Sequence, residues 1–261
     1  MQFPKFNRKA IDIHVHFNHG VPGDNYNPSF TGLCDSTLDF VIAEHERFGI
    51  GEAGFSTYAS VLSSEYIFEE NEYLKTVSNN MKNVYQWVVV HPEKEKTFKQ
   101  AEDMLLSKKC LGIKLHSPMH GYDICEHADK LFSFANRLGT VILMHPDKIN
   151  VMAAFANKYP NMKLIIAHLG SLEHINAIKE AKYGNIYADT SGYLSSLNNI
   201  VEYAVDTVGS EKILFGTDTY SPAFQYSRIA LARISQSDKE NILYKNAIRL
   251  FPNTFNKKEQ K

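Results

Sequence analysis

Short apolar runs alternate with longer amphipathic segments along the whole chain. Runs rich in Val, Ile, Leu and Phe are typical of buried strands, whereas apolar residues at helical spacing are typical of helices packed on one face. These patterns predict eight strands, at residues 10–17, 49–56, 84–91, 111–116, 140–145, 163–168, 185–190 and 212–218. They also predict helices at residues 38–48, 69–79, 93–107, 126–138, 151–158, 172–182, 195–208, 221–234 and 237–251.

The regular alternation of strand and helix favours a sheet of parallel strands joined by helices. Runs such as VILM at 141–144 and LIIA at 164–167 have no polar face, so both of their faces must be covered. Eight such strands favour an α/β fold with a single (β/α)8 TIM barrel, and an open doubly wound sheet is the alternative. Because no linker or repeat divides the chain, we predict one barrel domain over residues 1–261, with a frayed tail at 252–261.

Composition and charge narrow the class of protein. Hydrophobic residues make up 44% of the chain and charged residues 22%, as in ordinary globular proteins. The formal net charge of −1 argues against a nucleic-acid surface or a polybasic membrane patch. The N-terminus has no apolar signal segment, and the three cysteines lack paired spacing, which indicates free thiols. We therefore expect a cytoplasmic protein without nucleic-acid or membrane partners.

The first predicted strand, AIDIHVHF, carries two histidines on one face. Side chains alternate along a strand, so Asp12, His14 and His16 are expected to point one way. Two imidazoles at this spacing can bind one metal ion together. The alternative is a pair of half-exposed histidines in a loop.

Histidine or aspartate also ends several of the later strands. The residues concerned are His116, His145, His168 and Asp218. In a (β/α)8 barrel the carboxyl ends of all strands meet at one mouth, where active sites are built. We predict that these side chains gather there. For the other histidines we predict a structural cap at His91, solvent-facing positions on helices for His45, His127 and His174, and loop positions for His19 and His120.

The ordered motifs of the chain resemble those of a known superfamily. They are HVH at 14–16, GIKLH at 112–116, His145, HLG at 168–170, DTSG at 189–192, FGTD at 215–218 and an N-A-x-R-L-F motif at 246–251. Over nearly its whole length the chain resembles the amidohydrolase superfamily, and in particular its branch of compact metal-dependent hydrolases and decarboxylases. It departs from many relatives at Pro146 and Asp147, where they have threonine and glycine. No residues for an accessory β-sandwich domain precede the first strand, so we expect none.

The resemblance implies a metal centre. His14, His16, His145 and Asp218 would bind a divalent cation, and His168 would either complete a second metal site or hydrogen-bond the attacking water and the substrate. Nitrogen and carboxylate ligands without thiolate favour zinc, with manganese, iron or cobalt as alternatives and one or two ions bound. Asp218 would exchange protons with the attacking water and the leaving group, and His168 would stabilise the oxyanion.

Three functions compete at this stage. The first is a metal-dependent hydrolase that cleaves an amide, ester or lactone of a small, anionic substrate. The second is a zinc-dependent, non-oxidative decarboxylase of a carboxylated ring compound. The third is an inactive barrel that binds a small molecule, which the intact set of ligand types argues against. A decarboxylase should place an arginine at the mouth, but Arg137, Arg228 and Arg233 fall on predicted helices, so we favour the hydrolase. A homo-oligomer is compatible with the sequence.

Lys114 shares strand parity with His116 and should face the barrel interior. A buried ammonium needs an anionic partner. The candidates are Asp12, a carboxylate of the substrate, or a carbamate formed on the lysine that bridges two metals. Among the functional options we favour the substrate carboxylate, which Lys114 and His116 would bind together.

Overall fold

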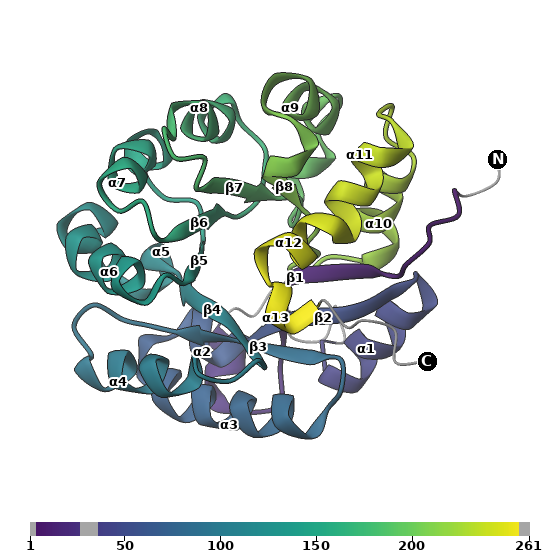
Figure 1. The fold of residues 1–261 in the computed structure, drawn as a ribbon. Coiled ribbons are helices and arrows are strands. Elements are labelled where there is room, and N and C mark those ends of the chain that lie inside the picture. The colour runs from purple at the N-terminus through teal and green to yellow at the C-terminus, as the bar shows by residue number, and fades with distance from the viewer. Residues whose placement is uncertain (1–3, 27–35, 256–261) are drawn as a thin grey trace.

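The protein, described here from a computed structural model that covers residues 4–26 and 36–255, is a barrel of parallel strands surrounded by helices (Figure 1). One sheet contains eight strands in the order of the sequence. Their bounds are Ala10–Phe17 (β1), Ile50–Thr57 (β2), Val84–Val89 (β3), Cys110–Leu115 (β4), Val141–Met144 (β5), Lys163–Ile166 (β6), Ile186–Asp189 (β7) and Ile213–Leu214 (β8). The predicted single (β/α)8 barrel is confirmed.

The barrel closes between its last and first strands through the chain that follows the short β8. The Ile13 amide donates to the Phe215 carbonyl at 3.0 Å, and the Thr217 amide donates to the His14 carbonyl at 3.1 Å. Val15 and Asp218 form a parallel bridge. This closure sets the end of β8 directly beside the histidines of β1.

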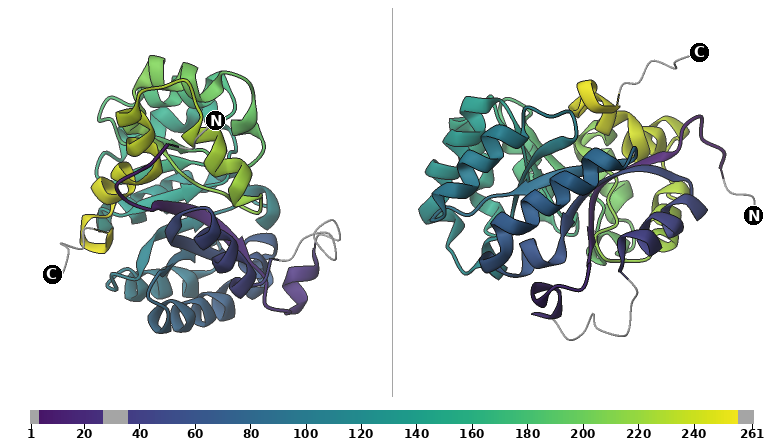
Figure 2. Two further views of the ribbon diagram at one scale, coloured as in Figure 1. Left: turned by 90° about the vertical axis from the view of Figure 1, so that its right-hand side faces the viewer. Right: turned by 90° about the horizontal axis from the view of Figure 1, so that it is seen from below.

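Helices cover the outside of the barrel, as Figure 2 shows from two further sides. The longer ones are Leu38–Arg47 (α1), Ile67–Asn80 (α3), Glu95–Met104 (α4), Ile124–Leu138 (α6), Met152–Lys158 (α7), Leu172–Glu180 (α8), Ile200–Val208 (α9) and Pro222–Ala230 (α10). The shorter ones are Tyr58–Leu62 (α2), Ser117–His120 (α5), Gln236–Glu240 (α11), Asn246–Leu250 (α12) and Pro252–Phe255 (α13), and the π-helical segment Asn241–Lys245 joins α11 to α12.

The interior of the barrel is filled by buried apolar side chains, with Trp87 among the largest. The indole N–H of Trp87 donates to the Ile13 carbonyl at 2.7 Å, which satisfies its only polar atom. Gly112 makes room for this ring, because a Cβ there would lie 2.8 Å from Trp87 and 2.2 Å from the Val141 carbonyl oxygen. A side chain at position 112 would therefore separate neighbouring strands.

The C-terminal segment differs from the prediction of a frayed tail. Residues 252–255 form α13, and the fully buried Phe255 packs edge-on against Tyr85 at 4.8 Å between ring centroids. Tyr85 lies near the start of β3, so α13 lies at the end of the barrel opposite the histidine-bearing strand ends. The prediction was wrong for 252–255 because burial of this aromatic residue anchors the helix, and residues 256–261 lie outside the described chain.

Two further expectations concern the cysteines and the membrane. Cys110 and Cys125 are free thiols, as predicted, whereas Cys34 lies outside the described residues. Within the described ranges, every helix is too short or too polar to cross a bilayer.

Candidate metal centre and active site

His14 and His16 lie at the end of β1 with their Nε2 atoms 3.2 Å apart. The Nδ1 of His14 lies 2.9 Å from the Asp189 carboxylate, and the Nδ1 of His16 lies 3.1 Å from the Ser56 carbonyl oxygen. Because a carboxylate and a carbonyl only accept hydrogen bonds, both Nδ1 atoms carry the hydrogen. The two Nε2 lone pairs therefore face one another, and a cation between them would satisfy both.

Asp218 completes this cluster from the chain that follows β8. Its Oδ1 lies 3.5 Å from the His16 Nε2, and its Oδ2 lies 3.8 Å from the His168 Nε2. Both Asp218 (φ +60°) and His168 (φ +64°) have left-handed backbone conformations, which are uncommon outside glycine. Backbone strain of this kind is concentrated at functional sites, where surrounding contacts hold it.

The cluster fits a divalent metal ion. Ligand atoms of His14, His16 and Asp218 all lie within 4.8 Å of one another. A cation bound at about 2.0–2.1 Å from each ligand spaces those ligands roughly 3–3.5 Å apart. The separations of 3.2 Å and 3.5 Å agree with that spacing. The donor set of nitrogen and carboxylate oxygen suits zinc, manganese, iron or cobalt.

His14, His168 and Asp189 form a second group of three potential metal ligands. Hydrogen bonds to one hydroxyl group account for the closeness of these side chains. The Oγ of Ser191 lies 2.9 Å from the Nδ1 atoms of both rings and donates its hydrogen to Asp189. Since that single hydrogen is used, Ser191 accepts from the His168 Nδ1, and the Nε2 of the same ring faces the Asp218 carboxylate.

Asp189 is the site residue to which sequence reasoning assigned no role. It is fully buried at the end of β7, and it accepts hydrogen bonds from His14 Nδ1 and from the amides of His168 and Ser191. Burial alone would raise the pKa of Asp189, but the charge and hydrogen bond of His14 outweigh it and hold that pKa below its ordinary value. The DTSG motif at 189–192 marked the position, although nothing in the motif named its partners.

We expect Asp189→Asn to fold and to bind metal about 10–100-fold more weakly, the range typical for loss of a partner that orients a ligand. The amide is a weaker acceptor than the carboxylate, so it holds the His14 tautomer less firmly. Titration against a chromogenic chelator measures the affinity, and near-ultraviolet circular dichroism checks the fold. An unchanged affinity would show that His14 is not a ligand oriented by Asp189.

His116 and His145 form a stacked pair beside the cluster. Their ring centroids are 4.0 Å apart with an interplanar angle of 12°, and the His145 ring lies 5.0 Å from that of His168. Burial lowers the pKa of His145 to about 2, so the ring is neutral. His145 is a member of neither of the two close groups of potential ligand atoms in the described residues. Its ring contacts that of His168.

Lys114 lies fully buried inside the barrel, as predicted, but Asp12, one of its three candidate partners, is not the group beside it. The Nζ atom lies 2.8 Å from the His14 Nε2, and among the described residues no carboxylate forms an ion pair with it. Burial lowers the pKa of Lys114 to about 8, against the opposing charges of Asp218 and Asp189. Lys114 thus adds a buried cation to the centre, near the carboxylates of Asp218 and Asp189 but without a direct ion pair to either.

Asp12 does not pair with Lys114, because the register of β1 shifts between Asp12 and Val15. The shift turns the Asp12 carboxylate towards His45 of α1, whose Nε2 lies 3.3 Å away. Asp12 accepts from the His14 amide at 2.9 Å and from the Thr217 hydroxyl at 2.5 Å. It therefore ties β1 to the segment that carries Asp218.

The remaining histidines correct three expectations, and one of them is His120, which ends the short helix α5 rather than lying in a loop. His45 and His174 are buried rather than solvent-facing, since His45 packs beside Asp12 and His174 Nε2 bonds the Ala167 carbonyl at 3.0 Å. The His91 Nδ1 accepts from the Glu93 amide, as a capping residue does. His127 is half-buried, His19 contacts Glu70, and His120 Nε2 lies 3.0 Å from the Ser60 carbonyl oxygen.

A family model described as "Amidohydrolase" matches residues 11–252 of the chain. This chain belongs to the amidohydrolase family. No curated protein matches it in sequence.

Solved structures of similar fold span almost the whole length of this amidohydrolase. The 2,6-dihydroxybenzoate decarboxylase from Rhizobium has a TM-score of 0.72 at 14% identity, covering 94% of this chain and 99% of its own. The 5-carboxyvanillate decarboxylase from Novosphingobium aromaticivorans, solved with manganese and 4-hydroxy-3-methoxy-5-nitrobenzoic acid, has a TM-score of 0.73 at 13% identity, covering 94% and 96%. A putative 2-pyrone-4,6-dicarboxylic acid hydrolase from Pseudomonas putida has a TM-score of 0.63 at 13% identity, covering 95% and 98%.

Proposed function

We propose that this amidohydrolase is a divalent-metal-dependent hydrolase that cleaves an amide, ester or lactone of a small anionic substrate. The observation that carries the proposal is the pair of opposed Nε2 lone pairs on His14 and His16 with the Asp218 carboxylate beside them. When bound there, a divalent cation would polarise a substrate oxygen or acidify a water molecule. We favour zinc, and the manganese in the similar decarboxylase makes that ion the first alternative.

The protein groups around the centre have separate roles in this proposal. Asp218 accepts a proton from the attacking water and returns it to the leaving group. His168 turns its Nε2 towards Asp218, where it would either complete a second metal site or hydrogen-bond the attacking water and stabilise the oxyanion. His145 would serve as a ligand only after its ring moves towards His14 and His16.

A second candidate is a non-oxidative decarboxylase, which the buried Lys114 favours. An ammonium without a carboxylate partner is suited to hold a substrate carboxylate, and two of the similar folds are decarboxylases of aromatic acids. The absence of arginine from the described centre no longer argues against this candidate, because Lys114 supplies the cation.

One experiment separates the two reactions. The metal-loaded protein is incubated in ¹⁸O-labelled water with lactones, amides and aromatic carboxylates, and both product mass and released carbon dioxide are measured. Hydrolysis places one solvent oxygen in the product. Carbon dioxide release without that oxygen would establish the decarboxylase, and binding without turnover across the panel would contradict both.

We expect Lys114→Met to raise the KM for an anionic substrate while bound metal stays unchanged. The substitution removes the charge that would hold the substrate anion, and methionine keeps the buried volume. Steady-state kinetics and elemental analysis measure the two quantities. A halved metal content would instead indicate a carbamate on Lys114 that bridges two ions, and unchanged kinetics would remove Lys114 from substrate binding.

A further inference from the structure

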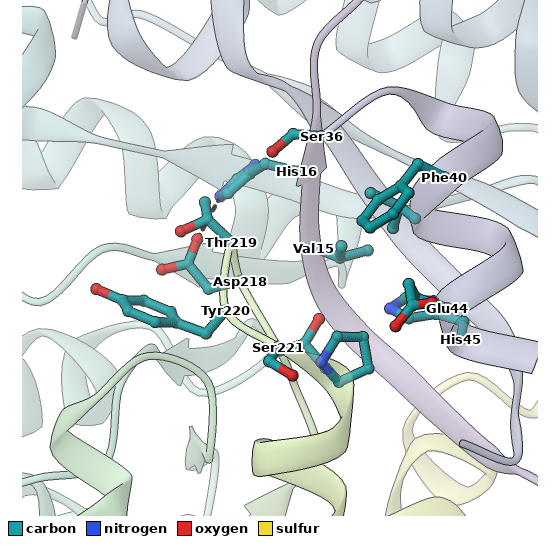
Figure 3. Close-up of a pocket in the computed structure, with 13 residues that line it drawn as sticks. Val15, His16, Ser36, Phe40, Glu44, His45, Asp218, Thr219, Tyr220 and Ser221 are labelled. Atoms are coloured by element: carbon teal, nitrogen blue, oxygen red, sulfur yellow. Dashed lines mark ion pairs between the residues drawn. The ribbon is translucent and has the colours of Figure 1, made fainter. Parts of the chain in front are cut away.

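A cavity of about 330 Å³ lies beside the metal centre, between α1 and the segment that follows β8. Figure 3 shows Phe40, Glu44 and His45 on one side of β1 and Asp218 and Tyr220 on the other. Its volume lies at the lower end of the range of small-molecule sites, roughly 300–1,000 Å³. A cavity of about 150 Å³ accepts benzene, so this one has room for a substituted ring or an acyl chain of similar size.

The cavity is continuous with the proposed reaction centre, because His16 and Asp218 form part of its wall. The same two residues lie 3.5 Å apart in the cluster that fits a metal ion. A group bound in the cavity therefore lies directly beside the carboxylate that we assign to proton transfer. Lys114 and His116 do not line the cavity, so the anion site and the cavity are separate.

The cavity has an apolar part beside polar lining residues such as Ser36, Thr219 and Ser221. Val15, Val41 and Pro222 provide aliphatic surface, and Phe40 and Tyr220 stay 42% and 40% exposed although they are large. No lysine or arginine occurs among the described lining residues, and two carboxylates, Glu44 and Asp218, do. Glu44 is paired with Arg47 and Asp218 would bind the metal ion, so the apolar part of the lining decides the occupant: an uncharged apolar group would cover the exposed rings of Phe40 and Tyr220.

We propose that this cavity binds the uncharged, apolar part of the substrate, a ring or acyl group, while Lys114 holds the anionic part. This inference rests on the proposed function and names the class of substrate: a small amphipathic molecule whose two ends lie on either side of the reacting bond. Phe40 and Val41 determine specificity for the apolar end.

The test uses the full metal-loaded chain and two fluorinated probes, so that binding is measured without turnover. The probes are 4-fluorobenzyl alcohol, which is neutral and aromatic, and trifluoroacetate, which is anionic and has no ring, and ¹⁹F NMR measures their dissociation constants. Phe40→Ala should weaken the neutral probe about 3- to 10-fold, the range for one lost aromatic contact. The matched control is Phe68→Ala on α3, where the phenylalanine is 39% exposed but lies outside the cavity, and it should leave both probes unchanged.

The anionic probe tests whether the anionic end and the apolar end of the substrate bind at separate places. Its affinity should fall in Lys114→Met and stay unchanged in Phe40→Ala. If the neutral probe bound Phe40→Ala, Phe68→Ala and the parent with the same affinity, the inference would be overturned even if hydrolysis were found. Phe40-dependent binding without hydrolysis would instead overturn only the proposed reaction.

Discussion

The His14→Ala, His16→Ala double variant is expected to bind no divalent metal at the centre and to lose all measurable turnover. Alanine removes both Nε2 lone pairs, which lie 3.2 Å apart and form the nitrogen half of the cluster. The remaining carboxylate of Asp218 cannot hold the ion in competition with water and chelator. Elemental analysis after dialysis against a weak chelator, followed by addition of one metal at a time, measures the loss.

His127→Ala is the control for this variant. His127 is half-buried on α6, and its ring contacts Tyr122 at 5.8 Å, away from the metal cluster. The control should keep the metal content of the parent. If the double variant also kept it, with an intact fold by circular dichroism, the metal would have to bind elsewhere and the proposed centre would be wrong.

We expect Asp218→Asn to keep the fold and lower turnover by about 10²–10⁴-fold, the usual contribution of a group that transfers protons. Asparagine adopts the left-handed conformation required at φ +60° more readily than most residues, so the backbone at this position is preserved. Its amide oxygen can still approach a cation, but it does not accept the proton of water at neutral pH. The measurement is kcat on a substrate identified by the panel, together with metal content.

The comparison variant is Asp206→Asn, which makes the same chemical change at an exposed position of α9. Its turnover should match that of the parent. A rate for Asp218→Asn within a few-fold of the parent would exclude proton transfer by Asp218. Loss of metal together with loss of rate would assign Asp218 to binding the ion rather than to moving the proton.

Local patterns were sufficient to predict the barrel and the place of its chemistry. Strands that are apolar on both faces need cover on both sides, and their alternation with helices leaves few topologies. Because parallel strands end at one mouth, His14, His16, His168 and Asp218 could be expected to meet from their order alone. The structure brings them together, with Asp218 at 3.5 Å from His16 and 3.8 Å from His168.

Alternation along a strand was less dependable where the backbone is irregular. Asp12 was expected to share a face with His14, but a register shift in β1 turns its carboxylate to His45. A bulge depends on how the strand pairs with its neighbours, which periodicity does not record. The same limit applies to His174, whose burial is stabilised by the Ala167 carbonyl and the Ser171 hydroxyl.

What the amino-acid sequence determined by itself is therefore the fold class and the gathering of histidine and aspartate side chains at one end of the barrel, because both depend on short-range pattern. Only the tertiary structure decided the tautomers of His14 and His16, the orienting role of Asp189, the isolation of Lys114 from any described carboxylate, and the cavity beside Asp218. Each of these depends on which groups from distant strands come within about 3–4 Å, the distance over which hydrogen bonds and close charges act.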